Sequence, residues 1–413
     1  MPTRNPLRFH FLCLAITVVV TLAQNSWAAT ESPVYSFSGG LDGSNPASQL
    51  IFDAAGNAYG TTVTGGSSGC GTVFQLSPSG GGQYHQSVLF SFDCFGTGKN
   101  PYGGVTLDAQ GNLYGTTVAG GSGGVCSGDG CGVVCKLTHS GGGWTENVLY
   151  SFGDSPDAAG PGGPVVFDPS GDLLGTTPDG GAFGVGTVYE LVSANGQWTE
   201  AVLHDFTGGP DGAVGSLGAL APDNSGNFYG VSELGGVNGA GTIFKIAPQE
   251  GGRWLFSTMY SFRGQPDAAF PYGGLIADSH NNLYGTTYYG GANGAGSVFR
   301  FNPFTTSRTA VLYSFQGGPD GGNPTSTLAF GPGGRLYGTT SAGGDPGCDC
   351  GVIFALAPVS SNRWHESVLH TFGTHPDGAY AYYGLAPDGA GNYLGTTAAG
   401  GNDNVGMIYK LTP

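Results

Sequence analysis

The sequence has few charged residues. They make up 10% of the 413 residues, and only 12 are basic against 28 acidic. A chain with so few basic groups repels nucleic acid and anionic membranes, so we expect neither as a partner. The chain also lacks long segments with a 3.6-residue apolar period, which predicts very little helix. Past the N-terminal region it has no long hydrophobic run, and therefore no membrane span is expected.

Motifs of several enzyme classes are missing as well. There is no zincin motif, no P-loop and no calcium loop of the DxDxDG kind. The stretch Gly120–Gly124 matches a nucleophile elbow formally, but it lies in a glycine-rich loop without the strand–turn–helix that such an elbow requires. The cysteines and histidines lack the spacing of metal ligands, so we expect no metal site and no cofactor. Calcium held by carboxylates stays open as an alternative.

The first 28 residues are typical of a signal peptide. Two arginines precede an apolar stretch, Phe9–Ala23, and Ser26 and Ala28 supply the small residues that a signal peptidase requires. At about 15 residues the apolar stretch is too short to span a membrane. We therefore expect cleavage near Ala28 and a mature chain, residues 29–413, that is secreted or periplasmic.

Glycine, by contrast, is abundant, and its 81 residues are spaced periodically. A Tyr-Gly-Thr-Thr unit recurs about every 55 residues, which is typical of a repeat architecture. Seven copies favour radial repetition over a solenoid, because a solenoid requires polar capping repeats and neither end resembles one. The copies and their variants are Tyr59–Thr62, Tyr114–Thr117, Leu174–Thr177, Tyr229–Ser232, Tyr284–Thr287, Tyr337–Thr340 and Leu394–Thr397.

Each copy divides into four strand-like runs separated by turn residues. In the fifth copy the runs are Gly273–Asp278, Asn282–Thr287, Ser297–Phe301 and Ala310–Phe315. We therefore predict an all-β fold, a seven-bladed β-propeller with four-stranded blades, in a single domain that covers residues 29–413.

Incomplete runs at the two ends predict how the ring closes. Val34–Phe37 is a fourth run without the preceding three, and Met407–Leu411 is a third run without a fourth. We expect Val34–Phe37 to form the outer strand of the blade made by Ala381–Leu411. Such a closure removes the free strand edges of the ring.

The repeated pattern extends well beyond Tyr-Gly-Thr-Thr. It reads G-L-x-x-D-x-x-G-N-L-Y-G-T-T-x-x-G-G, then G-T-V-F-x-L, and Asp53–Thr62 and Asp108–Thr117 match it best. This pattern resembles the GloVer tandem repeat of exported bacterial proteins over residues 32–413. The resemblance implies export and a propeller-like fold, without an established chemistry. The chain lacks a sorting tail at Leu411-Thr412-Pro413, so we expect release rather than surface anchoring.

The loops that link one blade to the next carry a repeated Pro-Asp pair. These loops share a face with the glycine-rich loops, so six carboxylates are expected to approach one central opening and to attract a cation or a hydroxyl-rich ligand. The competing interpretation is turn chemistry, in which each aspartate bonds its own backbone. The candidate ligand-binding residues are Asp42, Asp157, Asp211, Asp267, Asp320 and Asp377, with Lys99 and Asn100 in the second copy.

Cysteine usage fits an oxidising compartment. Cys94 ends a fourth strand, which runs antiparallel to the third strand that begins just after Cys70. The members of the two other cysteine pairs are close in sequence. Cys135 stands where the first copy has Phe74, which predicts a buried free thiol. The expected disulfides are Cys70 with Cys94, Cys126 with Cys131, and Cys348 with Cys350.

Two functional hypotheses follow. The leading one is a secreted, non-catalytic, monomeric propeller that binds polysaccharide or an extracellular protein. The alternative is a carbohydrate-active hydrolase or lyase that uses aspartate and histidine residues on the blade-linking face. His204 and His370 replace a tyrosine of the other copies, so we interpret them as structural residues.

Overall fold

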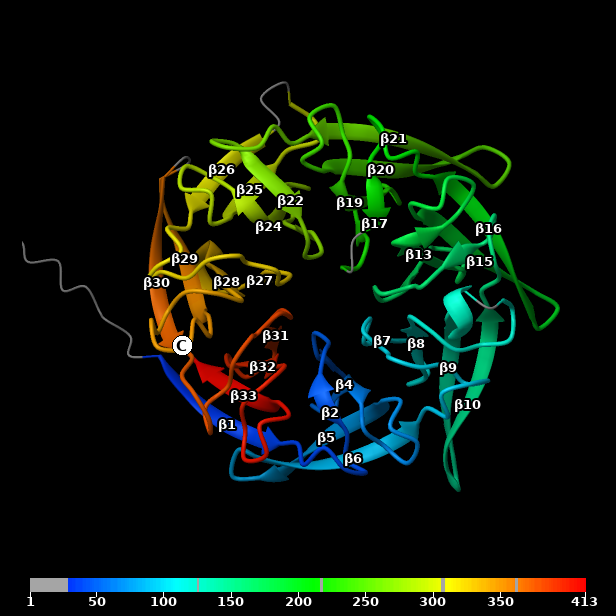
Figure 1. Ribbon diagram of the computed structural model, residues 1–413, viewed down its shortest axis with the longest axis horizontal. Helices are drawn as coiled ribbons and strands as arrows, with labels where there is room; N and C mark the ends of the chain where they lie inside the picture. Colours follow the sequence, from blue (N-terminus) through cyan, green and yellow to red (C-terminus); the bar gives the residue numbers. More distant parts are fainter. Residues whose placement is uncertain (1–28, 125, 216–217, 306–308, 361–362) are drawn as a thin grey trace, which may run out of the picture.

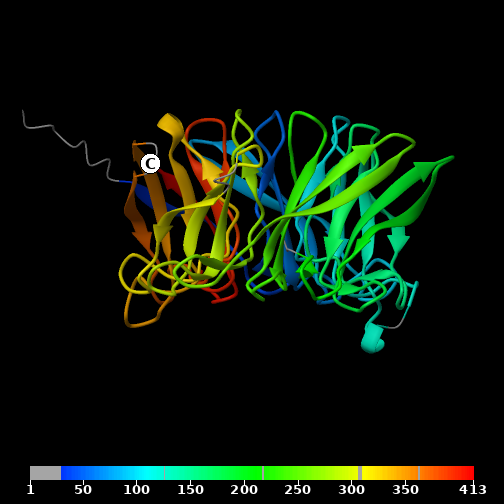
Figure 2. The same ribbon diagram turned by 90° about the horizontal axis from the view of Figure 1, so that it is seen from above.

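The described strands form seven blades arranged as a ring in the computed structural model, and the prediction of a seven-bladed β-propeller is confirmed (Figure 1). The structure describes residues 29–124, 126–215, 218–305, 309–360 and 363–413, so the predicted signal peptide lies outside the described residues. The strands run between two faces where the loops gather (Figure 2). No helix in the described part of the chain is long and apolar enough to cross a membrane.

Each blade contains an antiparallel sheet whose strands follow one another from the ring axis outward, and in the third blade Ala158–Ala159 and Asp179–Gly180 pair as a separate two-stranded sheet. The first blade contains β2 (Ser44–Pro46), β3 (Ile51–Phe52), β4 (Ala58–Thr64), β5 (Thr72–Gly80) and β6 (Gln83–Ser91). The second contains β7 (Val105–Leu107), β8 (Leu113–Thr117), β9 (Val133–Ser140) and β10 (Gly143–Ser151). The third contains β11 (Ala158–Ala159), β12 (Val166–Phe167), β13 (Leu173–Thr177), β14 (Asp179–Gly180), β15 (Thr187–Ala194) and β16 (Gln197–Asp205).

The fourth blade contains β17 (Ala213–Gly215), β18 (Ala221–Pro222), β19 (Phe228–Leu234), β20 (Thr242–Gln249) and β21 (Arg253–Ser261). The fifth contains β22 (Ala268–Pro271), β23 (Ile276–Ala277), β24 (Leu283–Gly290), β25 (Ser297–Phe301) and β26 (Thr309–Ser314). The sixth contains β27 (Ala329–Phe330), β28 (Leu336–Thr339), β29 (Val352–Ser360) and β30 (Arg363–Thr371). The last blade contains β31 (Ala386–Pro387), β32 (Tyr393–Thr397), β33 (Met407–Thr412) and β1 (Thr30–Ser36). Two 3-10 turns, η1 (Cys126–Gly128) and η2 (Pro332–Gly334), are inserted in the second and sixth blades.

The ring closes through the N-terminal strand, as the sequence predicts. β1 pairs antiparallel with β33, and their register places Thr30 opposite Thr412 and Ser36 opposite Met407. The two strands lie side by side in Figure 1, where the blue start of the chain meets its red end. Phe37 follows β1, is fully buried, and packs edge-on against Phe74 of the first blade. The N-terminal segment therefore completes one blade and contacts the next.

The Asp-Asn-Tyr part of the repeat forms one hydrogen-bonded turn. In the first blade, Asp53 accepts the backbone N–H groups of Ala55 and Asn57 at 2.9 and 2.8 Å. Its second oxygen accepts the Asn57 side-chain amide at 2.8 Å and the Tyr59 hydroxyl at 3.0 Å. Such side-chain bonds fix the first hairpin of a blade. The repeated aspartate of this turn is therefore explained by blade construction.

The glycine of Tyr-Gly-Thr-Thr is required by a close approach between strands. Gly285 lies opposite Phe299 in the register of β24 and β25, and a Cβ added at Gly285 would meet the Phe299 ring at 2.7 Å. The second blade differs, because Cys135 replaces the aromatic residue opposite Gly115, and the nearest atom to an added Cβ is 3.5 Å away. Cys135 is a buried free thiol, as predicted.

This difference between the two blades predicts that the same glycine-to-alanine substitution destabilises the protein in the fifth blade and has little effect in the second. Gly285→Ala is expected to destabilise the protein by about 1–3 kcal/mol, because it overpacks a filled core. Gly115→Ala is the matched control, and its effect should stay within about 0.5 kcal/mol because the added methyl group makes only ordinary van der Waals contacts. Denaturant unfolding of both variants measures the free-energy changes. Equal destabilisation of the two would contradict the explanation.

The inner edge of a blade differs from the single first strand that we predicted over Gly273–Asp278. In the fifth blade, two short strands, β22 and β23, pair with β24, and Tyr272–Leu275 between them is unpaired. Pro271 has no N–H to donate, which favours a break at that point. The first and fourth blades are interrupted in the same way. These unpaired segments form the wall of a cavity on the ring axis.

Candidate ligand-binding site

A cavity of about 550 Å³ lies where the inner segments of the blades meet. This volume is typical of small-molecule sites. Every blade contributes to its wall, as is expected for a cavity on the axis of the ring in Figure 1. One lining residue from each of the seven blades, in order, is Gln49, Tyr102, Pro164, Gly218, Tyr272, Thr325 and Tyr382.

Five tyrosines dominate the cavity wall. Tyr102, Tyr272 and Tyr382 occupy one register position in three blades, three residues before the repeated apolar residue of the inner segment. Tyr383 follows Tyr382, and Tyr288 enters from the end of β24. We did not identify this cavity from the sequence. The sequence does contain a signal for it, because the other blades have Ala, Gly, Leu or Thr at a position where three blades have Tyr.

The wall is held by hydrogen bonds from blade to blade. The Thr325 hydroxyl donates to the carbonyl of Tyr382 at 2.9 Å, and the backbone N–H of Gly274 donates to the Thr327 hydroxyl at 2.9 Å. The Gln49 side-chain amide donates to the carbonyl of Leu385 at 3.0 Å, across the junction of the first and last blades. These bonds fix the inner segments relative to one another. The cavity is therefore preformed, which lowers the entropy cost of binding.

A series of aromatic rings leads from the surface into the cavity along the fifth blade. Phe270, Tyr289, Tyr288 and Tyr272 follow one another with centroid distances of 5.8, 4.6 and 6.4 Å. Tyr289 is 49% exposed, and Tyr272 lines the cavity. Phe270 adopts the left-handed conformation at φ 57°. Equivalent residues of other blades also have positive φ, so this conformation belongs to blade construction; they are Asn45, Asn100, Gly160, Asn323 and Tyr380.

The cavity tyrosines present neutral hydroxyl groups. Burial raises the pKa of Tyr272, of Tyr382 and of Tyr383 above the usual range. Their phenols therefore stay protonated at physiological pH and offer both a donor and an acceptor. Each ring adds an apolar face, so the wall matches a ligand that has both apolar and hydroxyl surfaces.

The six predicted aspartates, five of which follow a proline, lie elsewhere, where the outer strands end. Asp42, for example, accepts the Tyr35 hydroxyl at 3.0 Å and the Ser38 backbone N–H at 2.8 Å. The other five also contact a Tyr or His seven residues earlier and a backbone N–H four residues earlier. The pairs are Tyr35–Asp42, Tyr150–Asp157, His204–Asp211, Tyr260–Asp267, Tyr313–Asp320 and His370–Asp377. None of these aspartates is among the residues that line the cavity.

Lys99 and Asn100 also lie outside the cavity wall. The Lys99 ammonium is 3.3 Å from the exposed Asp129 carboxylate. The Asn100 side-chain amide donates to the carbonyl of Val63 at 3.1 Å, which joins the first and second blades. Both side chains therefore contact the protein's own groups at the edge of the second blade.

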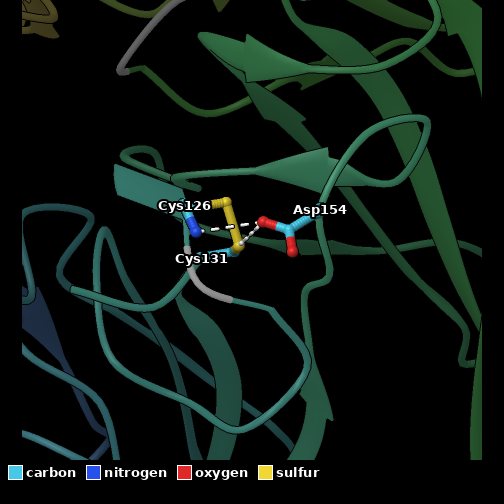
Figure 3. A group of neighbouring side chains, drawn as sticks. All are labelled: Cys126, Cys131 and Asp154. Atoms are coloured by element: carbon cyan, nitrogen blue, oxygen red, sulfur yellow. Dashed lines mark hydrogen bonds between the residues drawn. A yellow bond between two sulfur atoms is a disulfide. The ribbon is translucent and has the colours of Figure 1, made fainter. Parts of the chain in front are cut away.

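Three disulfides join the cysteine pairs that the sequence suggests: Cys70–Cys94, Cys126–Cys131 and Cys348–Cys350. Figure 3 shows the second of them beside Asp154, whose carboxylate accepts the Cys126 backbone N–H at 3.0 Å. The sulfurs and this carboxylate lie within 4.8 Å of one another, but sulfurs bonded to each other are not the thiolates that a metal requires. Cys126, Cys131 and Asp154 are therefore explained as parts of a loop that the disulfide closes.

Glu31, His370 and Asp377 form another group whose polar atoms lie within 4.8 Å, and Asp168, Asp172 and Glu190 form a third. In the first of these, His370 contacts Asp377 at 3.3 Å. Both groups belong to the repeated contacts of strands and turns, away from the cavity wall.

Comparisons with known proteins address the fold and the family. A solved structure of a candidate oxidoreductase (glucose dehydrogenase) from Thermus thermophilus is similar with 16% identity and a TM-score of 0.44, over 93% of this chain and 99% of that one. A protein of unknown function from Dyadobacter fermentans is similar with 12% identity and a TM-score of 0.47, over 82% of this chain and 97% of that one. No curated protein matches the sequence.

The sequence itself matches a family model. The Gloeobacter/Verrucomicrobia repeat matches residues 122–277 and 252–413, which together cover more than half of the chain. The second matched segment contains Gly285, whose close approach to Phe299 explains the glycine of the repeat. The chain belongs to the Gloeobacter/Verrucomicrobia repeat family.

Proposed function

We propose that the protein is a non-catalytic binding propeller that holds a carbohydrate chain in its tyrosine-lined cavity. The observation that carries the proposal is the preformed cavity with five tyrosines in its wall. A sugar ring has an apolar C–H face and hydroxyl groups at its edge. A tyrosine complements both, because it offers an aromatic face and a hydroxyl donor and acceptor.

Charge supports a sugar over an anionic ligand. The chain has 28 acidic and 12 basic residues, and among the described residues the cavity lining contains neither Lys nor Arg. A phosphate or sulfate group would therefore meet no cation in this part of the wall. Neutral hydroxyl-rich chains and cationic chains remain compatible with this charge distribution.

The proposal includes export. The signal-peptide pattern of residues 1–28 and the three disulfides both fit an oxidising compartment outside the cytoplasm, and residues 29–413 would then be the mature, single propeller domain. N-terminal sequencing of the protein recovered from periplasm or medium should begin at Ala29. Retention of the intact N-terminus in the cytoplasm would contradict export.

Binding is tested by titrating neutral oligosaccharides into the purified protein after a glycan-array screen. Tyr272→Ala is expected to weaken binding of the best neutral ligand by about 5- to 150-fold, because it removes a central aromatic contact worth about 1–3 kcal/mol. Phe304→Ala is the control, since Phe304 is 67% exposed and does not line the cavity. Binding to no glycan, or equal loss in both variants, would contradict the proposal.

The same samples test the enzyme alternative. Release of reducing sugar that disappears in Asp157→Ala or Asp211→Ala, at unchanged thermal stability, would favour the hydrolase or lyase. The hydrogen bonds of these aspartates to Tyr150 and His204 favour a turn role instead. We therefore expect no release by the unmodified protein.

A further inference from the structure

One junction between blades brings together a histidine, an aspartate and a glutamate. His370 of β30 and Asp377 in the following loop meet Glu31 of β1, and one ligand atom of each lies within 4.8 Å of the other two. β30 and β1 are the adjoining outer strands of the sixth and last blades (Figure 1). The spacing of residues in the sequence does not indicate this group, because its members come from opposite ends of the chain.

The strand register shows that this combination departs from the repeat. The residues equivalent to Glu31 in the first six blades are Gln86, Glu146, Glu200, Phe256, Thr309 and Glu366. The residues equivalent to His370 are Tyr35, Phe90, Tyr150, His204, Tyr260 and Tyr313. The other three glutamates follow a blade with Phe or Tyr at the second position, and His204 is followed by Phe256. Among these paired strands, a histidine therefore meets a glutamate only where the ring closes.

The His370 ring nitrogen lacks a hydrogen bond. Its Nε2 atom is buried and has no hydrogen-bond partner among the described residues, although it lies 3.3 Å from the Asp377 carboxylate. The matching His204 differs, because its Nε2 is hydrogen-bonded to Asp211 at 3.0 Å and its ring stacks on Phe256. Packing and hydrogen bonding thus account for His204, whereas His370 keeps a nitrogen that is free to bind a ligand.

Glu31 supplies a second buried atom without a partner. One of its carboxyl oxygens has no hydrogen-bond partner in the described part of the chain. The same holds for Glu146, Glu200 and Glu366, but no histidine faces those residues. A buried polar atom without a partner is costly, and a single cation between Glu31 and His370 would satisfy both atoms.

The geometry and the donor set fit zinc. Ligands of a tetrahedral zinc ion lie about 3.4 Å apart when each bond is about 2.1 Å, and His370 Nε2 and Asp377 Oδ2 are already 3.3 Å apart. Backbone N–H groups of Gly373 and Gly378 donate to Asp377, both at 2.8 Å, and hold its carboxylate in place. The Asp377 side chain is 30% exposed, so an ion and a fourth ligand, water, can enter from solvent.

We propose that Glu31, His370 and Asp377 bind a zinc ion, which joins the closing strand β1 to the sixth blade. Imidazole selects zinc over calcium, because calcium prefers oxygen ligands alone. The ion stabilises the closed ring, since its three ligands come together only when β1 is in place. This site is separate from the tyrosine-lined cavity and independent of its ligand.

The test titrates zinc into the untagged, metal-free protein, residues 29–413, by calorimetry at pH 7.5. One equivalent is expected to bind, and zinc at 100 times its Kd should raise the melting temperature by about 5 °C. His370→Tyr and Glu31→Gln should each weaken binding at least about tenfold. Both introduce a residue that another blade has at the same position, Tyr150 and Gln86, so the fold should be kept.

His204→Tyr is the matched control and should bind zinc like the parent, because Phe256 rather than a glutamate faces that histidine. Absence of zinc binding, or equal binding by His370→Tyr and His204→Tyr, would overturn the proposal. Tighter binding of calcium than of zinc would overturn it too, since carboxylates alone would then hold the ion. Cobalt bound in place of zinc is a second measurement on the unmodified protein, and a spectrum without the visible bands of four-coordinate cobalt would contradict the site.

Discussion

A chain that begins at Ser38 instead of Ala29 is expected to melt on the order of 10–20 °C lower, because the last blade loses its outer strand. The truncation removes six registered residue pairs between β1 and β33. It also removes Phe37, which is fully buried, and deletion of such a side chain alone costs about 3–5 kcal/mol. The unpaired edge of β33 would in addition promote aggregation.

Calorimetry of the two chains, starting at Ala29 and at Ser38, measures this effect. A synthetic peptide of residues 29–40, added in excess, should restore much of the melting temperature, since binding to the folded form stabilises it by mass action. Phe37→Ala should give an intermediate value. Identical melting of both chains would show that the ring does not depend on this strand.

Raising the pH from 5 to 9 is also expected to lower thermal stability, because three glutamates in outer strands keep their protons in the folded state. Burial, with the neighbouring Asp157 carboxylate, raises the pKa of Glu200 to about 9. Burial and a nearby aspartate likewise raise the pKa of Glu146 and of Glu366 to about 7. Each has one buried carboxyl oxygen without a hydrogen-bond partner among the described residues.

The direction in which stability changes with pH follows from proton linkage. In the unfolded chain these carboxyls ionise near their ordinary pKa of 4.5. A pKa raised by folding stabilises the folded state fully below the unfolded value, and this stabilisation is lost as pH rises through the folded value. The loss therefore falls between about pH 4.5 and pH 9. Partial solvent exposure reduces each contribution to about 1 kcal/mol, which together corresponds to a Tm change on the order of 5 °C.

The variant E146Q/E200Q/E366Q tests whether these three glutamates cause the loss of stability at high pH. Glutamine resembles the protonated acid in shape and charge, so the triple variant should melt like the parent at pH 5 and on the order of 5 °C higher at pH 9. The exposed Glu250→Gln variant is the control and should keep the pH dependence of the parent. A parent whose melting temperature stays constant or rises toward pH 9 would contradict the prediction.

The sequence predicts the fold because the repeated residues build the blades. The turn bonds of Asp53 and the close approach at Gly285 recur with the repeat and leave a periodic trace in the sequence. The exchange of Phe74 for Cys135 is visible for the same reason. The two-part inner strand could not be predicted, because the pairing of Ala268–Pro271 with β24 depends on where the chain enters the next blade.

The candidate site could not be predicted from the repeat pattern. A residue that recurs in nearly every blade, such as Asp157, serves the blade, whereas a site on the axis is formed by residues that differ between blades. Tyr102, Tyr272 and Tyr382 are such departures. Which of them face one another depends on the three-dimensional ring, in which segments distant in sequence share one wall.

The pairing of Thr30 with Thr412 also has a kinetic consequence. The strand that leaves the ribosome early has its partner almost 400 residues later, so ring closure waits until nearly the whole chain is available. The blades are local hairpins that form quickly, but this one contact has the largest sequence separation and the largest loop-closure entropy. We therefore expect a late folding step in which an open ring of hairpins captures its first strand, and Phe37 becomes buried only then.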